Sequence, residues 1–174
     1  MEKRLFIWQI VGITFTAVTG TLLHFLYQWT KWRIFAPVSA VNESTWEHMK
    51  LAFVPSLLFA VTQSFFAEEY GNFWLVKLIG ISVGTALIPV IFYTLRGSFG
   101  EISTVIDITI FFVAVICEYL LEFYLFGIID CNLYQKLISL SLLLLGVVAF
   151  TLFTFYPPQI PLFLDPVTNG YGIT

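Results

Sequence analysis

Two glutamates and a histidine stand close together just before the second apolar segment of the chain. Glu43 and Glu47 are four residues apart, and His48 follows directly. On one helix, this spacing places both carboxylates on the same face, where they repel each other unless a cation, a shared proton or a basic side chain lies between them. His48 would then point about 100° away. The pattern indicates either an ion- or ligand-binding site, or an interfacial turn whose carboxylates complement the helix N-terminus and pair with basic residues such as Lys50.

His24 is the next candidate, about five helical turns into the first apolar segment. Because consecutive membrane spans run antiparallel, we expect it at the same membrane edge as the start of the second helix. A neutral imidazole there could bind a metal or hydrogen-bond a carbonyl or a glutamate. We therefore predict that His24 lies within direct or water-bridged reach of Glu43 or Glu47, and that His24, Glu43 and Glu47 could hold a divalent metal ion. The alternative is a structural histidine in an ion cluster.

A third group of carboxylates lies in a later apolar segment, at Asp107, Glu118 and Glu122. An ionised side chain at the centre of a bilayer costs about 2.5–3.5 kcal/mol on insertion scales, so such residues need a partner or a purpose. Glu118 shares a helix face with Asp107 and would face the bundle interior. It could mark a proton or cation path, or stay protonated in a structural hydrogen bond. We expect Asp107 and Glu122 nearer the membrane interfaces.

Composition places these residues in a membrane protein. Of the 174 residues, 59% are hydrophobic and only 11% are charged, so a lipid bilayer must act as the solvent for much of the surface. The formal net charge is −3 and the eight basic residues are scattered, which excludes a nucleic-acid surface. The two cysteines form no CxxC pattern, which predicts neither a disulfide nor a cysteine-based metal site.

The elements that must position these side chains are five apolar runs, each long enough to cross a hydrocarbon core of about 30 Å. The sequence predicts an all-α, polytopic transmembrane bundle over residues 1–156, with breaks at 68–72, 96–101 and 130–132. The expected spans are Leu5–Trp29, Met49–Phe66, Phe73–Leu95, Thr104–Phe126 and Leu137–Tyr156. The first run is too long for a signal peptide and reads as an uncleaved span. An odd span count puts the two termini on opposite sides, although basic residues divide evenly and give no orientation.

Beyond the fifth run, residues 157–174 carry four of the seven prolines and cannot be helical throughout. We expect an extended tail whose apolar residues pack against the bundle. In the third run, Gly80 and Gly84 form a GxxxG pattern that permits close helix approach. This pattern favours tight packing within one chain, and nothing else in the sequence indicates a homo-oligomer.

Two segments resemble a family of small bacterial membrane proteins known only as a domain of unknown function. They are the run Ala36-Pro37…Val41-Asn42-Glu43-Ser44-Thr45-Trp46-Glu47-His48-Met49-Lys50-Leu51 and the tail Pro157-Pro158…Pro161-Leu162-Phe163…Asp165-Pro166-Val167…Gly170-Tyr171-Gly172. The resemblance extends to the first span with His24, so it covers both ends of the chain. It implies a multi-pass protein of the bacterial cytoplasmic membrane and brings no known activity.

Three classes of function remain open. The leading hypothesis is binding or transport of a small molecule or an ion in a polar pocket formed by His24, Glu43, Glu47, His48 and Glu118. The second is a membrane-embedded enzyme that acts on a lipid or isoprenoid with a carboxylate-bound divalent metal. The third is a scaffold subunit of a membrane complex. The sequence contains no GxSxG, HExxH, P-loop or GxGxxG motif, so it names no enzyme class.

Overall fold

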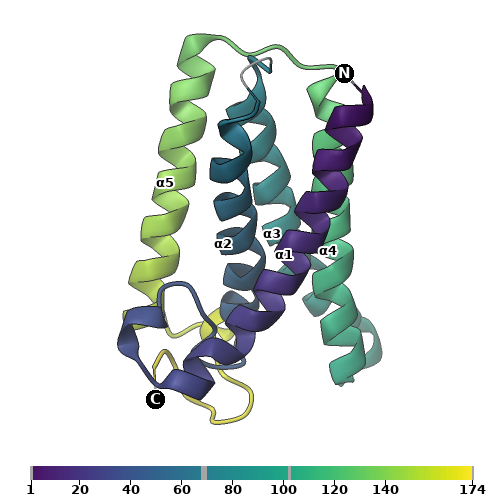
Figure 1. The fold of residues 1–174 in the computed structure, drawn as a ribbon. Helices are drawn as coiled ribbons and strands as arrows, with labels where there is room; N and C mark the ends of the chain where they lie inside the picture. The colour runs from purple at the N-terminus through teal and green to yellow at the C-terminus, as the bar shows by residue number, and fades with distance from the viewer. Residues whose placement is uncertain (1, 68–69, 102, 174) are drawn as a thin grey trace.

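The computed structural model describes residues 2–67, 70–101 and 103–173. In these residues five long helices form an up-and-down bundle with two short 3₁₀ turns (Figure 1). The helices are α1 (Glu2–Thr30), α2 (Thr45–Ser64), α3 (Phe73–Phe99), α4 (Thr104–Phe126) and α5 (Leu133–Phe155), and the 3₁₀ turns are η1 (Arg33–Phe35) and η2 (Pro161–Phe163). The predicted break at 68–72 falls partly on residues 68 and 69, which lie outside the described part.

Four of the five helices, α1, α3, α4 and α5, are long and apolar enough to cross a membrane. Large apolar side chains cover their outer surfaces, as at Leu144, Leu145 and Val148 of α5. Such surfaces are stable in lipid and not in water. The chain is therefore an integral membrane protein. Its α2 helix is less apolar, because Glu47, His48 and Lys50 occupy the first two turns, and a fifth span stays a prediction.

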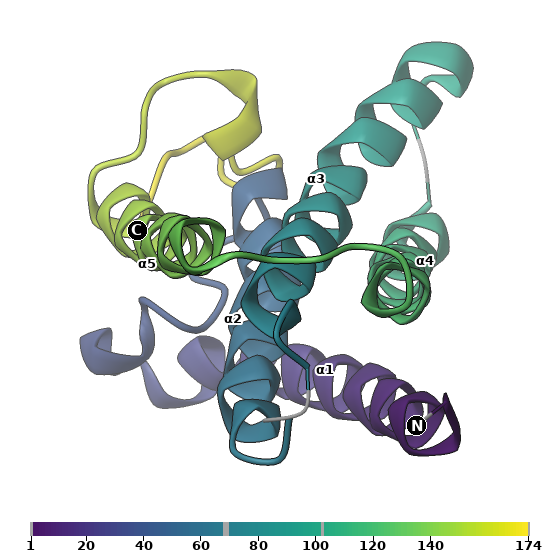
Figure 2. The same cartoon turned by 90° about the horizontal axis from the view of Figure 1, so that it is seen from above.

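The α2 helix lies at the centre of the bundle. Seen along the helix axes, α2 and α3 separate α5 from α4, and α1 crosses one side (Figure 2). One core cluster joins α2, α3 and α5 through Phe53, Ile81 and Phe150. A second cluster joins α2, α3 and α4 through Ala52, Ile88 and neighbouring side chains. The helix with the most polar sequence is thus the one that its neighbours cover best.

Several helix boundaries differ from the predicted ones for local reasons. The α3 helix continues through Gly97 to Phe99 and ends where Gly100 adopts a positive φ of 80°. The α5 helix starts at Leu133, four residues early, because Asn132 and Gln135 form a reciprocal capping box. The α2 helix starts at Thr45, before the expected span at Met49, as the N-cap residue Ser44 ahead of it predicts. In each case hydrogen bonds at the helix end extend the helix beyond its apolar part.

The C-terminal segment lies at the same end of the bundle as residues 31–44, called here the loop end (Figure 1). Phe163 is buried there, and its ring centroid lies 4.7 Å from that of Trp46. The Asn42 side-chain amide donates a hydrogen bond of 2.9 Å to the Gly172 carbonyl. These contacts join the loop, the start of α2 and the tail. Stable docking of the tail in solution stays a prediction.

The two glycines of the GxxxG pattern face α4 within the same chain. A Cβ atom at Gly84 would lie 2.6 Å from a carboxylate oxygen of Glu118, and one at Gly80 would lie 2.7 Å from an oxygen of Glu122. Real Cβ atoms do not approach other atoms so closely. The glycines therefore make room for two buried carboxyl groups between α3 and α4.

Candidate functional site

Three side chains converge at the loop end: His24 from α1, Glu43 from the loop and His48 from α2. The Nε2 atom of His24 lies 3.7 Å from one oxygen of Glu43, and the Nε2 atom of His48 lies 3.7 Å from the other. One donor atom from each residue lies within 4.8 Å of the other two. All three side chains are partly exposed, so a dissolved ion could reach them.

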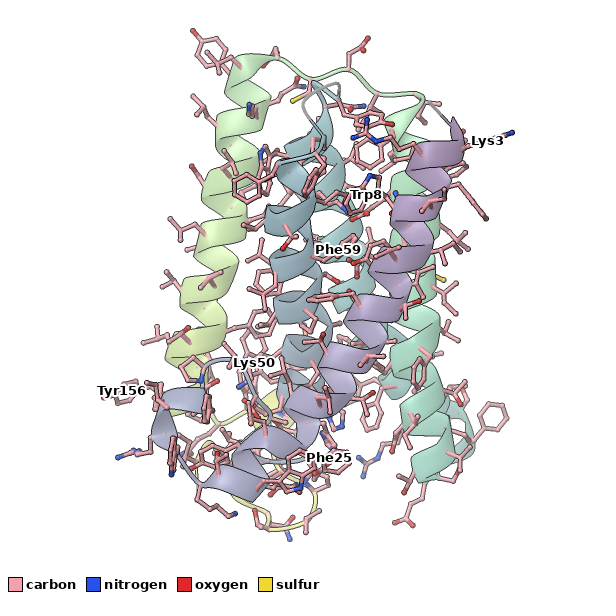
Figure 3. The ribbon with its side chains drawn as sticks, in the orientation of Figure 1. Lys3, Trp8, Phe25, Lys50, Phe59 and Tyr156 are labelled. Carbon is pink, nitrogen blue, oxygen red and sulfur yellow. The ribbon has the colours of Figure 1, made fainter. Side chains whose placement is uncertain are left out.

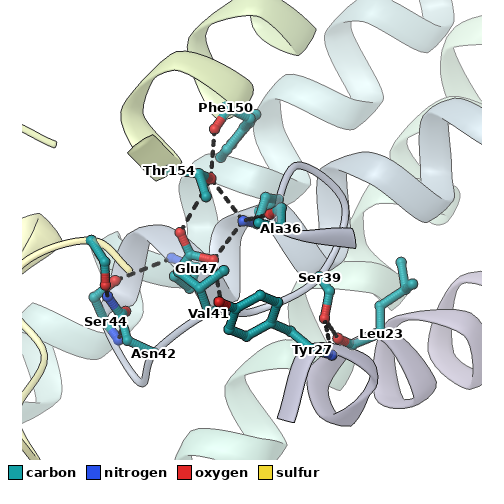
Figure 4. A network of polar contacts seen from close by, with 12 residues as sticks. Leu23, Tyr27, Ala36, Ser39, Val41, Asn42, Ser44, Glu47, Phe150 and Thr154 are labelled. Atoms are coloured by element: carbon teal, nitrogen blue, oxygen red, sulfur yellow. Dashed lines mark hydrogen bonds and ion pairs between the residues drawn. The ribbon is translucent and has the colours of Figure 1, made fainter. Parts of the chain in front are cut away.

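The loop brings Glu43 to this position. Ser39 donates a hydrogen bond to the Leu23 carbonyl and accepts one from the Tyr27 amide, so its hydroxyl interrupts the helical ladder of α1 beside His24 (Figure 4). Farther along, the Asn42 side chain accepts a hydrogen bond of 2.9 Å from the Ser44 amide, a local turn typical of asparagine. The loop is thereby fixed against the last turns of α1.

Two expectations about this region are wrong. Glu43 and Glu47 do not share a helix face, because Ser44 is the N-cap of α2 and has an extended backbone, which leaves Glu43 outside the helix. His48 does not point away from the carboxylates, since it faces Glu43. The helical spacing applies only if Glu43 lies within the helix, as it would with Asn42 as N-cap, whereas the helix starts at Thr45. Ser44 accepts a hydrogen bond from the Glu47 amide instead.

Hydrogen bonding prepares His48 to bind a cation. Its Nδ1 atom lies 2.9 Å from the Ser44 carbonyl oxygen, which can only accept, so Nδ1 carries the proton. In the neutral ring Nε2 then has a free lone pair directed at the site. The Gln28 amide donates a 3.4 Å hydrogen bond to Glu43. On the other side, the buried Nδ1 atom of His24 has no hydrogen-bond partner among the described residues.

Glu47 belongs to a different cluster. Its carboxylate forms an ion pair of 2.5 Å with Lys50 and accepts a hydrogen bond of 3.0 Å from the Val41 amide (Figure 4). The Lys50 ammonium group also donates to the Ala36 carbonyl and to the Thr154 hydroxyl, each at 2.8 Å. An ammonium group has three donors, and all three are used. This network joins the loop, α2 and α5 and pairs Glu47 with Lys50 rather than with the two histidines.

A second buried lysine lies in the half of the bundle away from the loop. Lys77 of α3 forms an ion pair of 2.5 Å with Glu122 of α4, and both side chains are at most 1% exposed. The rings of Phe59, Phe73 and Tyr119 surround the ammonium group at 5.1 to 5.7 Å from their centroids. Figure 3 shows Phe59 near the middle of the bundle, farther from the loop end than Lys50. Glu122 is therefore paired with a buried cation inside the bundle, and its expected position near a membrane interface stays a prediction.

Glu118 lies one helical turn from Glu122 and is completely buried. Ser56 of α2 offers it a hydroxyl, but neither carboxyl oxygen has a hydrogen bond of ordinary geometry among the described residues. Asp107 is half-buried in the first turn of α4 and interacts electrostatically with His48 and Arg96. The predicted site residues thus divide among three places: His24, Glu43 and His48 lie together, Glu47 lies beside Lys50, and Glu118 lies beside Glu122.

Lys77 is a site residue that was not predicted, although its position in the sequence carries a signal. Lys77 lies four residues after the start of α3 at Phe73, and Glu122 lies four residues before the end of α4 at Phe126. Because consecutive helices are antiparallel, these positions have the same depth in the bundle. A search for opposite charges at matched depths would have predicted this ion pair.

Comparison with curated proteins and with solved structures finds no match. Residues 2–173 match a family of unknown function, DUF6512. This match confirms the family membership that the loop and tail segments suggested. Four helices in the described part of this chain are apolar and long enough to cross a membrane. The chain belongs to DUF6512, a family of unknown function.

Proposed function

We propose that this membrane protein binds a divalent transition-metal ion at the loop end through His24, Glu43 and His48. The observation that carries the proposal is the convergence of two imidazole Nε2 atoms on one carboxylate, with donor atoms within 4.8 Å of one another. The residues come from α1, the loop and α2, so the site forms only in the folded chain.

The donor set has the chemistry and nearly the dimensions of a zinc site. Zinc binds histidine nitrogen and carboxylate oxygen at about 2.0–2.2 Å, which places two ligands of a tetrahedral ion about 3.3 Å apart. The two nitrogen–oxygen separations of 3.7 Å are close to this value, but they involve different oxygens of Glu43. The three donor atoms as a set lie within 4.8 Å of one another, so the side chains must move closer by about an ångström to share one ion. The fixed Nδ1 proton of His48 supports the same assignment, because ligating histidines generally donate their other ring N–H.

Three protein ligands leave at least one coordination position open. An open position suits an ion that is taken up and released, which agrees with ion binding or transport as the leading function. Two histidines and one carboxylate with an open position are also the ligand set of several catalytic zinc sites. A metal-dependent enzyme that acts on a lipid at the membrane edge is therefore the second candidate function.

The proposal includes α2 as a fifth span. It packs mainly against α1 and α3, and the Glu47–Lys50 ion pair and its hydrogen bonds satisfy the charges of its first turns. A helix with such internal pairing can enter the bilayer despite its lower hydropathy. A bacterial cytoplasmic membrane as the location rests on the resemblance alone.

Zinc titration of the purified protein tests the binding site. We expect one equivalent of Zn²⁺ to bind the wild type in calorimetry, and both His48→Ala and Glu43→Gln to abolish stoichiometric binding while the thermal unfolding curve stays cooperative. The control Glu101→Gln, which changes an exposed carboxylate, should bind as the wild type does. Wild-type protein without saturable binding, or unchanged affinity in both site variants, would contradict the proposal.

A structural ion cluster predicts a different pattern. If protonated imidazoles only neutralise Glu43, the same substitutions should lower thermal stability and no metal should bind in any variant. For a metal-binding protein, zinc flux into proteoliposomes then separates the two candidate functions: a transporter carries the ion across the bilayer, whereas an enzyme keeps it at one edge.

A further inference from the structure

The two buried lysine clusters differ in how completely their polar groups are satisfied. At Lys50, all three ammonium donors have oxygen partners. At Lys77, the ammonium group has one oxygen partner, on Glu122, and otherwise faces aromatic rings. One oxygen of Glu122 and both oxygens of Glu118 are buried without a partner among the described residues. Buried polar groups are rarely left unpaired unless something binds them.

The charges of the Lys77 cluster do not balance if every group is ionised. Lys77 carries one positive charge, and Glu118 and Glu122 would carry two negative charges. Two carboxylates one turn apart in a water-excluded bundle repel each other strongly. The ion pair with Lys77 fixes the charge on Glu122. Electroneutrality therefore requires one bound cation at Glu118.

We infer that Glu118 is the binding site of a single exchangeable proton inside the bundle. The oxygens of Glu118 lie against Gly84, whose missing side chain leaves the space that the carboxyl group occupies. This inference concerns the half of the bundle opposite the metal site and does not depend on the proposed function. We assign the bound cation as a proton; a divalent metal ion is disfavoured, because the Lys77 ammonium group repels its double charge more strongly.

The surroundings of Glu118 supply hydroxyl groups that can pass a proton. Thr16 of α1 lies 2.8 Å from the Tyr119 hydroxyl and 3.4 Å from the Ser56 hydroxyl, and Ser56 is directed at Glu118. The titratable groups that face Glu118 are Lys77 from α3 and Glu122 and Tyr119 from α4, whereas α1 and α2 contribute Thr16 and Ser56. Transfer along these hydroxyls leaves the ion pair intact, and all three are themselves buried, so the described chain of hydroxyls stays inside the bundle.

Infrared spectroscopy of the carboxylic-acid C=O band tests the inference at neutral pH. The wild type should show one such band, which shifts in D₂O within the time in which exposed amides exchange. Glu118→Gln should remove the band. Glu122→Gln should also remove it, because Glu118 then ionises to pair with Lys77. Lys77→Met should double the band, since both carboxyl groups then need a proton. Asp107→Asn, a carboxyl change elsewhere on α4, should leave it unchanged.

The wild-type spectrum decides the question even if a variant fails to fold. Absence of the band shows that Glu118 is ionised, and a doubled wild-type band shows that Lys77 is neutral; either result overturns the charge assignment. A band that persists in Glu118→Gln assigns the proton to another residue. A band that does not shift in D₂O until the protein unfolds shows a permanently buried acid and overturns exchange.

Discussion

Replacement of Lys50 by methionine should be among the most destabilising single changes outside the apolar core. The ammonium group is fully buried and bonded to Glu47, to the Ala36 carbonyl and to Thr154. The substitution leaves the Glu47 carboxylate, only 2% exposed, without its counter-charge. Removal of one partner of a buried ion pair costs about 3–5 kcal/mol. We expect a loss of that size in the free energy of unfolding.

Denaturant unfolding in detergent micelles, followed by tryptophan fluorescence, measures this loss. The control Lys136→Met removes an exposed lysine and should change the unfolding free energy by less than about 0.5 kcal/mol. The double variant Glu47→Leu with Lys50→Met should lose less than Lys50→Met alone, because no charge is then left buried. The reasoning is refuted if Lys50→Met is as mild as the control, or if the double variant loses the sum of both single changes.

Three further predictions concern the fold. The tail from Pro157 to Tyr171 should resist limited proteolysis in detergent, and Trp46→Ala should expose it; rapid cleavage of the wild type without loss of thermal stability would contradict docking. Accessibility labelling of cysteines added at the two termini should report opposite sides of the membrane, and labelling from one side would exclude five spans. Gly84→Ala should destabilise by about 1–3 kcal/mol through overpacking, whereas Gly97→Ala in the same helix should not, and equal effects would contradict the packing.

The helices were predictable from the sequence, because apolar runs of spanning length leave few alternatives in lipid. Both ends of α4 and the start of α3 agree with the prediction. The start of α5 does not, since it depends on individual hydrogen bonds such as the Asn132–Gln135 capping box. The same limit affected the site. Composition and order placed His24 near the loop, but only the position of the N-cap Ser44 decides that Glu43 faces the histidines.

The predicted metal ligands were His24, Glu43 and Glu47, whereas the structure brings His48 and not Glu47 to His24 and Glu43, for a related reason. Sequence spacing could not show that Glu47 forms an ion pair with Lys50. The Lys50 ammonium group is also held by a hydrogen bond to Thr154, more than a hundred residues later in the chain. Contacts between distant segments also account for Glu118, whose surroundings come from α1, α2, α3 and α4. The expected position of Glu118 and Glu122 inside a membrane indicated that each carboxylate needs a partner. The depth of Lys77 in the bundle could have identified the partner of Glu122.

The central claim is a metal ion held jointly by α1, the loop and α2. Anomalous X-ray scattering at the zinc edge, from crystals grown with Zn²⁺, locates such an ion directly. We predict one strong peak at about 2.0–2.2 Å from a nitrogen of His24, a nitrogen of His48 and an oxygen of Glu43. The absence of an anomalous peak between these three side chains would contradict the account. A zinc peak elsewhere, with neither imidazole bound to it, would contradict it as well.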